Sequence, residues 1–416
     1  MPGYALAFDL GTTTLAASLI DCATGQRLAM TGSMNPQRRF GADVVSRLAA
    51  AVNSEAALQE MAALIRAELL RLARELCTVS GVSWGEIKQA AIAGNPAMEH
   101  LLLGLPVNVL AFPPYRPLFT GGRLVTAGEL EWDSEAQVYI FPMPGGFVGG
   151  DTVAFLYGAA PGEAALCLDM GTNGEMALTA GATIWATSAA AGPAFEGGNL
   201  SCGMAALPGA VSSIRIEAER VRITTIGNGE PVGICGSAAI ELVTELLRHG
   251  ILEAGGRLRS AAEIPSNLGQ RVIQQDGESA FVIHRDARRL LFLTQGDIRQ
   301  IQLAKGAIRA GMEVLAERSG VAFPALRDVL LTGSFGAVLR PTWLKTIGIF
   351  DEGMVQISRF SPEGVLAGVE RALTENDRFD SVERLGTRFR VVPLSGTPQF
   401  EAMFMRHLDF PDWVDR

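Results

Sequence analysis

The sequence has few of the residues that bind metal clusters. Its 416 residues include five cysteines and four histidines, and no two cysteines are closer than the 33 positions that separate Cys202 from Cys235. Iron–sulfur clusters and structural zinc sites need cysteine or histidine ligands at short spacings. We therefore expect no iron–sulfur cluster in this chain, and we expect its cysteines to be reduced and mostly buried.

Runs of basic residues and long apolar runs are also absent. The formal net charge of −9 argues against a nucleic-acid partner, because no basic patch is evident that could displace counterions from phosphates. The most apolar run, residues 101–112, is interrupted by Gly104, Pro106 and Asn108 and is too short to span a bilayer. Since the N-terminus also lacks a basic region followed by an apolar segment, we expect a cytoplasmic protein without a membrane partner.

A repeated strand and turn is the most informative feature that is present. Residues 5–14 recur 160 positions later at 165–174, and both copies read as an apolar strand, Asp-x-Gly-Thr and a second strand. Backbone N–H groups in such turns form concave nests that hold phosphate oxygens. The two aspartates, Asp9 and Asp169, can hold a hydrated Mg²⁺. The repeat predicts a nucleotide-phosphate clamp built from two related halves that face each other across a cleft.

The hydrophobic pattern predicts an α/β protein. A hydrophobic content of 48% with 19% charged residues indicates a globular chain, and 416 residues favour two domains. Periodicity and turn residues predict strands at residues 4–8, 15–21, 27–34, 87–93, 137–141, 164–169, 175–179, 183–187, 213–217, 220–225, 329–332 and 389–394, and helices at 42–52, 55–77, 96–103, from 151, 238–248, 297–319, 362–373 and 399–408.

A late strand followed by residues 333–336 (Gly-Ser-Phe-Gly) completes a set of motifs that resembles a known superfamily. This is the ASKHA superfamily of acetate and sugar kinases, heat-shock chaperone ATPases and actin. Within it, the sequence is most similar to the ATPase domain of reductive activators of corrinoid proteins. The resemblance covers residues 4–410 and rests on residues 9–14, 35–37, 41–44, 94, 95, 98, 169–175, 189–197, 201–204, 233–237 and 302–308.

The resemblance implies two ribonuclease-H-like (actin-like ATPase) subdomains that flank a nucleotide cleft. They would comprise residues 1–150 and residues 151–416, the second with an inserted β region and C-terminal helices. ATP and Mg²⁺ are the implied cofactors. The implied catalytic residues are Asp9, Asp169 and Glu175, with Asp9 and Asp169 as metal ligands. The implied cofactor-binding residues are Gly11, Thr12, Thr13, Thr14, Gly171, Thr172, Asn173, Gly174, Glu196, Gly236, Ser237, Gly333, Ser334 and Gly336, of which Gly236, Gly333 and Ser334 would face the adenosine.

The resemblance also implies a function. The family uses ATP to drive the one-electron reduction of cobalt(II) to cobalt(I) in a corrinoid protein, and the electron enters through an N-terminal 2Fe–2S domain. This sequence departs from that pattern, because it starts at the ATPase domain and carries no cluster ligands. We therefore expect an ATPase that couples nucleotide-driven closure to a corrinoid protein partner. The electron would come from an iron–sulfur or ferredoxin-like donor in trans, and a homodimer is one assembly compatible with this function.

Some interpretations stay open. Residues 35–37 and 41–43 suit either a capped turn before a helix or part of the cleft rim. Cys235 suits a redox role or packing near the nucleotide, and Glu196 could contact a Mg²⁺-bound water or the ribose, or only solvent. A small-molecule kinase would use the same clamp with a carboxylate base that the sequence does not identify. A non-catalytic, nucleotide-dependent scaffold would bind ATP without turnover.

Overall fold

The computed structural model describes residues 3–333 and 339–412. Ser334 and Gly336, both expected near the nucleotide, lie outside these described residues. The chain divides into two compact units. Unit 1 comprises Met1–Glu163, Thr179–Thr187 and Ser361–Pro393, and unit 2 comprises Ala164–Leu178, Ser188–Phe360 and Leu394–Arg416. The sequence suggested a single boundary after residue 150, whereas in this division the chain returns to unit 1 twice.

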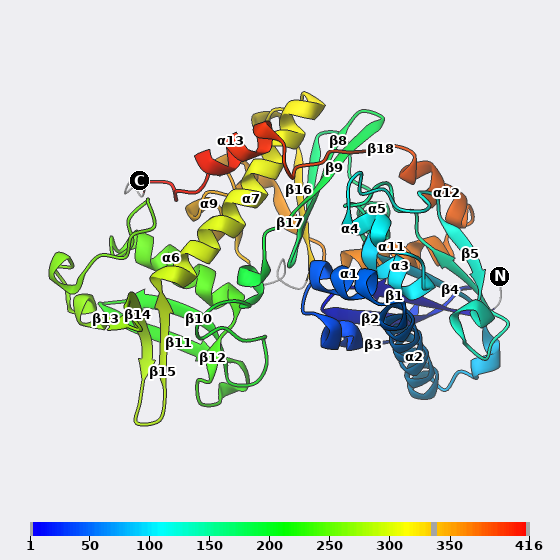
Figure 1. Cartoon of the computed structure of the whole chain (residues 1–416), viewed down its shortest axis with the longest axis horizontal. Coiled ribbons are helices and arrows are strands. Elements are labelled where there is room, and N and C mark those ends of the chain that lie inside the picture. Colours follow the sequence, from blue (N-terminus) through cyan, green and yellow to red (C-terminus); the bar gives the residue numbers. More distant parts are fainter. Residues whose placement is uncertain (1–2, 334–338, 413–416) are drawn as a thin grey trace. The chain divides into compact units, whose positions relative to one another are not determined.

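Unit 1 is built on a six-stranded sheet in the order β3-β2-β1-β4-β6-β5 (Figure 1). The sheet pairs β1 and β2 antiparallel, while β4 runs parallel to β1. The carboxyl ends of β1 and β4 therefore meet at one edge, where Leu10 lies beside Gly94. The strands are β1 (Tyr4–Leu10), β2 (Thr14–Asp21), β3 (Arg27–Met34), β4 (Ile87–Gly94), β5 (Arg123–Thr126) and β6 (Gln137–Ile140).

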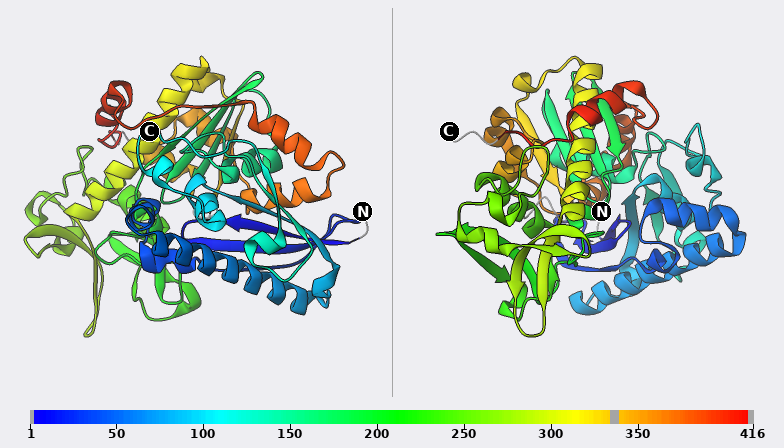
Figure 2. Two further views of the ribbon diagram at one scale, coloured as in Figure 1. Left: turned by 45° about the vertical axis from the view of Figure 1, so that its right-hand side comes forward. Right: turned by 60° about the vertical axis from the view of Figure 1, so that its left-hand side comes forward.

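Helices cover both faces of this sheet. The long helix α2 (Glu55–Ser80) lies along one face (Figure 2), where Leu15 and Leu19 of β2 join its buried side chains in one core. Ser18 points to the opposite face, because successive side chains alternate along a strand, and it donates to Glu370 of α11 (Gly364–Thr374) at 2.5 Å. The other helices of unit 1 are α1 (Val44–Asn53), α3 (Pro96–Leu103), α4 (Asn108–Ala111), α5 (Gly150–Ala159) and α12 (Arg378–Gly386).

Residues 361–393 join unit 1 mainly through α11. Arg27 of β3 donates to Glu370 at 2.6 Å and pairs with Glu363 at 2.5 Å. Helix α11 also lies unusually close to α5, since a Cβ on Gly368 would be 1.7 Å from the carbonyl oxygen of Ala154. Only glycine permits this approach of two helix backbones. The returning segment is thus an integral layer of unit 1.

A second six-stranded sheet has the order β17-β16-β7-β8-β9-β18. As at the start of the chain, β7 and β8 form an antiparallel hairpin, and β16 runs parallel to β7. The boundary between the units falls within β8 and β9. The strands are β7 (Ala165–Met170), β8 (Gly174–Ala180), β9 (Thr183–Ala189), β16 (Asp328–Thr332), β17 (Ser358–Phe360) and β18 (Phe389–Val391).

Two small sheets and several helices complete unit 2. One sheet contains β10 (Ala210–Glu217), β11 (Arg220–Thr225) and β12 (Gly233–Ile234), and the other contains β13 (Val272–Gln275), β14 (Glu278–Arg285) and β15 (Leu290–Thr294). The helices are α6 (Gly236–Arg248), α7 (Gln295–Ser319), α9 (Pro341–Thr346), α10 (Glu352–Ile357) and α13 (Pro398–Arg406). None of the helices in the described residues combines the length and the apolar composition needed to cross a membrane.

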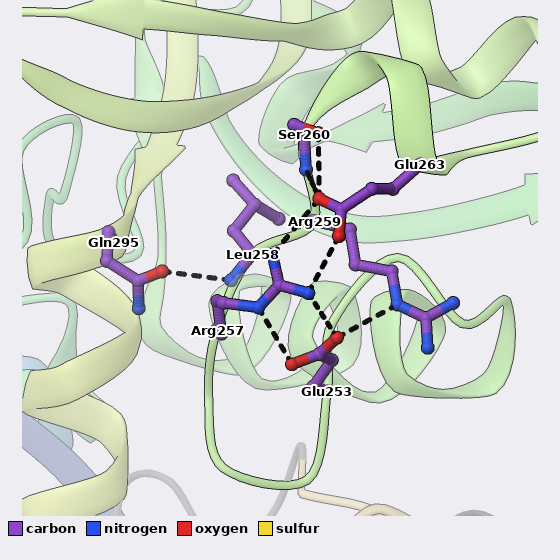
Figure 3. Close-up of polar contacts among 7 residues, drawn as sticks. All are labelled: Glu253, Arg257, Leu258, Arg259, Ser260, Glu263 and Gln295. Carbon is purple, nitrogen blue, oxygen red and sulfur yellow. Dashed lines mark hydrogen bonds and ion pairs between the residues drawn. The ribbon is translucent and has the colours of Figure 1, made fainter.

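An ion-pair network holds the turn that follows α6 (Figure 3). Arg257 donates to Glu253 at 2.8 Å and to Glu263 at 3.0 Å, and Arg259 donates to Glu253 at 3.3 Å. The backbone N–H of Leu258 donates to the side chain of Gln295, the first residue of α7, at 2.9 Å. Because these ion pairs are solvent-exposed, each contributes little to stability. The ion pairs join residues of the turn to one another, and the hydrogen bond from Leu258 to Gln295 connects the turn to α7.

Candidate functional site

The first Asp-x-Gly-Thr turn joins β1 to β2 in unit 1. Asp9 lies opposite Ala16 across the hairpin, and the connection between β1 and β2 spans Gly11 to Thr13. A Cβ on Gly11 would lie 2.4 Å from the carbonyl oxygen of Thr14, which explains why this tight turn requires glycine. The residues that follow Gly11 are partly or fully exposed. Residues 12–14 are therefore not buried in unit 1.

Two asparagines hold this turn from neighbouring elements. The buried Asn35 donates from Nδ2 to the carbonyl oxygen of Gly11 at 2.9 Å, and its backbone N–H donates to the carbonyl oxygen of Thr13 at 2.9 Å. Asn95 donates from Nδ2 to Oγ1 of Thr12 at 2.9 Å. The sequence analysis did not name either as a site residue, although both belong to the stretches that carry the resemblance. The available signal for Asn95 was a polar residue directly after a buried strand.

The segment after β3 supports the same turn. Asn35 accepts from the N–H of Gln37 at 2.9 Å, and Asp43 caps α1 with its side chain. The buried guanidinium of Arg47 donates to the carbonyl oxygen of Gly41 at 3.0 Å, and burial lowers the pKa of Arg47 to about 10. The structure therefore shows residues 35–43 as a capped turn before a helix. A role for them at the rim of a cleft stays a prediction.

Two carboxyl groups lie near the end of β4. Glu99 is fully buried and accepts from the N–H of Gly94 at 3.1 Å, and desolvation raises the pKa of Glu99 well above its usual range. Desolvation also raises the pKa of Asp151, at the start of α5, to about 6. Helix α5 begins close to this edge of the sheet, since a Cβ on Gly149 would lie 2.4 Å from the carbonyl oxygen of Gly94. The carboxyl group of Asp151 therefore keeps its proton to a higher pH than an ordinary aspartate, a property that the sequence analysis missed.

The Glu99→Gln variant should change how stability depends on pH. A carboxyl group whose pKa is raised in the folded state stabilises the fold while it is protonated, and this contribution is lost as the pH rises. Between pH 5 and pH 7 the variant should gain about 1 kcal/mol or more in free energy of unfolding relative to the wild type. Denaturant unfolding at the two pH values measures this. The same substitution at the exposed Glu135 is the matched control, and an equal pH dependence in wild type and Glu99→Gln would contradict the prediction.

The second Asp-x-Gly-Thr turn joins β7 to β8 in unit 2. Asp169 lies directly opposite Glu175, six positions later, whereas in the first turn Asp9 lies opposite a residue seven positions later. Directly opposed side chains project from the same face of an antiparallel pair, and like charges there are destabilising. A divalent cation beside the two carboxylates would remove that repulsion. The register of the second turn therefore places two carboxylates side by side, and a role for them in binding a metal ion stays a prediction.

A half-buried glutamate lies against the second turn. Thr172 donates from Oγ1 to Oε2 of Glu196 at 2.7 Å, and burial raises the pKa of Glu196 even though this hydrogen bond opposes the shift. On the neighbouring strand, Ser188 donates to Oε1 of Glu175 at 3.2 Å. Glu196 thus contacts the turn, which excludes mere solvation. Its contact with a Mg²⁺-bound water or with ribose stays a prediction.

Gly333 follows β16 and lies against Asp169. Its φ of +90° favours glycine, and a Cβ on this residue would be 2.3 Å from Oδ1 of Asp169. The absent side chain therefore leaves room for the carboxylate of the second turn. Contact between Gly333 and adenosine stays a prediction.

The start of α6 packs on the turn that carries Glu196. A Cβ on Gly236 would lie 1.7 Å from the carbonyl oxygen of Phe195, so glycine is required there by backbone packing. Ser237 is buried, and its Oγ lies 3.2 Å from Sγ of the buried Cys235, which supports the packing interpretation of that cysteine. The described site residues predicted in unit 2 thus form one connected group.

The residues present fit a magnesium ion that arrives with a nucleotide. Among residues 3–333 and 339–412, no group of three or more His, Cys, Asp and Glu side chains could hold a metal ion. Mg²⁺ usually binds through one or two carboxylates and completes its shell with waters and substrate phosphates. Asp169 in the second turn and Asp9 in the first each provide one such carboxylate, and Glu175 lies opposite Asp169.

Comparison with known proteins points to one family. The model of the RACo middle region matches residues 4–160, and the model of the C-terminal domain of RACo, the ASKHA domain, matches residues 163–415. The corrinoid activation enzyme RamQ of Eubacterium limosum is 28% identical over 99% of this chain and 71% of its own length. The Co(II) methylated amine-specific corrinoid protein reductase of Methanosarcina barkeri is 25% identical over 91% of this chain and 71% of its own length.

A solved structure supports the same assignment. The reductive activator for corrinoid, iron-sulfur protein superposes with a TM-score of 0.85 at 29% identity, covering 99% of this chain. The chain spans 66% of the length of that solved relative. The shared fold is the two-subdomain α/β architecture of actin-like ATPases, as the sequence predicted. Since the two family models together match nearly all of its residues, the chain belongs to the RACo family and comprises that family's middle region and C-terminal ASKHA domain.

Proposed function

We propose that this chain binds and hydrolyses ATP with Mg²⁺, and that hydrolysis drives the reduction of cobalt(II) to cobalt(I) in a corrinoid protein. One observation carries the proposal. The second turn opposes Asp169 to Glu175 and binds Glu196 through Thr172, in a chain that is similar to corrinoid activators along almost its whole length.

Each turn would contribute differently to the ATPase step. Asp9 and Asp169 would hold Mg²⁺, which supplies positive charge to the phosphate oxygens when it is bound. In each turn, the backbone N–H groups of residues 11–13 and of residues 171–173 would donate to phosphate oxygens. Glu175, which is oriented by Ser188, would accept a proton from the attacking water. Gly236 and Gly333 would face the adenosine, as would Ser334, which lies outside the described residues, and Ser237 would also bind the nucleotide.

The electron is proposed to come from a separate iron–sulfur or ferredoxin-like carrier. The five cysteines are free thiols, and their wide spacing supplies no set of cluster ligands. ATP hydrolysis yields ADP and phosphate and transfers no electron. The carrier would therefore be oxidised by one electron as one cobalt(II) is reduced to cobalt(I). A cytoplasmic location, where reduced carriers are available, belongs to the same proposal.

One observation favours a second candidate, a small-molecule kinase of the same superfamily. Such an enzyme needs a carboxylate base beside a substrate hydroxyl, and Asp151 is a partly exposed carboxyl group whose pKa is raised to about 6. General bases work best when their pKa lies near the working pH. Asp151 would therefore be the candidate for the base that the sequence alone did not identify.

A phosphate-release assay separates these functions. The protein is incubated with Mg²⁺ and ATP, either alone, with a cobalt(II) corrinoid protein, or with small hydroxy and carboxylic metabolites. We expect free phosphate to form and the corrinoid protein to stimulate its release. If phosphate is transferred to a metabolite at a rate that the corrinoid protein does not change, the protein is a small-molecule kinase and the proposal is wrong. ATP binding without turnover under all conditions would indicate a scaffold.

A further inference from the structure

Asn95 has a side-chain orientation that its two hydrogen bonds determine. It is the N-cap of α3, directly after β4, and its Oδ1 accepts from the backbone N–H of Met98 at 3.1 Å. A backbone N–H can only donate, so the amide atom that faces it must be the oxygen. The atom 2.9 Å from Oγ1 of Thr12 is therefore the amide nitrogen, Nδ2.

This orientation determines what the hydroxyl of Thr12 can do. An amide nitrogen can only donate, so Thr12 accepts from Asn95 and retains its own proton for another acceptor. In the second turn the corresponding threonine, Thr172, already uses its hydroxyl proton, because it donates a hydrogen bond to Glu196. Of these two threonines, Thr12 is thus the one whose hydroxyl remains able to donate.

Helix capping alone does not account for an asparagine at this position. Serine, threonine and aspartate cap helices about as well, but only asparagine adds the second, donating atom. The position is also rigid. Gly94 lies beside Leu10 in the sheet, and a Cβ on Gly149 would be 2.6 Å from the Cα of Asn95. The side chain therefore reaches Thr12 from a fixed backbone.

We infer that Asn95 is a positioning residue that makes the hydroxyl of Thr12 a hydrogen-bond donor to a phosphate oxygen of ATP. The inference rests on the proposed function, because it needs a phosphate at the first turn. It goes beyond that function by assigning a role to a residue outside the two Asp-x-Gly-Thr motifs. Asn95 acts through Thr12 and does not itself touch the nucleotide.

The Asn95→Asp variant tests this inference while retaining the cap. Aspartate still accepts the N–H of Met98, but its second oxygen accepts the proton of Thr12 and removes it from the phosphate. Calorimetric titration with Mg²⁺ and an ATP analogue that has an imido group between its β- and γ-phosphates should show affinity reduced about 10-fold or more. The thermal midpoint should stay close to that of the wild type. In contrast, Asn95→Ala should lower it, because the cap is lost.

A double-mutant cycle with Thr12→Ala separates hydrogen-bond reversal from simple charge repulsion. If Asn95 acts through Thr12, the substitution Asn95→Asp should weaken binding much less in the Thr12→Ala background than in the wild type. An equal loss in both backgrounds would overturn the inference and indicate repulsion alone, as would unchanged affinity in Asn95→Asp. Failure of the wild type to bind the analogue would instead overturn the proposed function, and the inference with it.

Discussion

The Asp169→Asn variant is expected to lose at least about 100-fold in Mg²⁺-dependent ATP turnover, which corresponds to about 2.7 kcal/mol of barrier. The substitution preserves the shape of the side chain but removes the charge that opposes Glu175 in the second turn. Without that charge, the proposed metal ion loses a ligand. The phosphate that is cleaved from ATP then loses the positive charge that the metal ion would supply. Release of phosphate from ATP under saturating Mg²⁺ measures the effect.

Asp328→Asn is the matched control for this variant. Asp328 lies on β16 of the same sheet, beside Ala165 at the opposite end of β7, and pairs with Arg359. Turnover of the control should stay within about threefold of the wild type. Turnover of Asp169→Asn within the same threefold range, roughly 0.6 kcal/mol, would exclude a metal-organising role for Asp169.

The Gly333→Ala variant is expected to reduce turnover by about 10-fold to 100-fold, which corresponds to 1.4–2.7 kcal/mol. The added Cβ would lie 2.3 Å from Oδ1 of Asp169, so the carboxylate must move away from its position in the second turn. A displacement of about 1 Å at a catalytic group can cost two orders of magnitude in rate. If Gly333 also contacts adenosine, the affinity for ATP should fall as well.

Gly320→Ala separates this displacement from backbone strain. Gly320 has a φ of +73°, comparable to that of Gly333, and a Cβ there would meet nothing within 4 Å. Both substitutions should lower the free energy of unfolding by about 1–2 kcal/mol. In addition to this shared loss of stability, only Gly333→Ala should reduce the rate of ATP turnover. Equal activities in the two variants would show that the contact between Gly333 and Asp169 does not matter for catalysis.

The elements with strong local signals were predictable from the sequence. The strand at residues 27–34 has the predicted bounds. The helix that begins at Pro96 ends at Leu103, and its C-cap is Gly104, a glycine with a φ of +65°. Caps and turn glycines are local chemistry that a single sequence displays. The small sheet of β13, β14 and β15 was missed, because β13 has only four residues and the buried residues of β14 do not alternate with exposed ones.

Contacts between residues far apart in the chain could not be predicted from the sequence. A glycine within a helix, such as Gly368, normally lowers the stability of the helix. Here it allows the backbone of α11 to pack closely against Ala154 of α5. Nothing in the sequence identifies that partner. For the same reason, the sequence did not indicate that residues 361–393 belong to unit 1.

The site shows the same division between local and non-local information. The repeat led directly to Asp9, Asp169 and the residues between the hairpin strands. The opposition of Asp169 and Glu175 depends on the register of the hairpin, which the repeat does not reveal. The bond from Asn95 to Thr12 joins residues 83 positions apart and therefore required the fold.

The measurement that most directly tests the proposed function follows the oxidation state of cobalt. A cobalt(II) corrinoid protein is mixed anaerobically with this protein, a reduced ferredoxin-like donor, Mg²⁺ and ATP, and cobalt(I) is recorded by its absorbance. We expect cobalt(I) to accumulate only when protein, donor and hydrolysable ATP are all present. It should accumulate with the Asp328→Asn variant but not with the Asp169→Asn variant. Accumulation at the same rate without ATP would contradict the proposed coupling between hydrolysis and cobalt reduction.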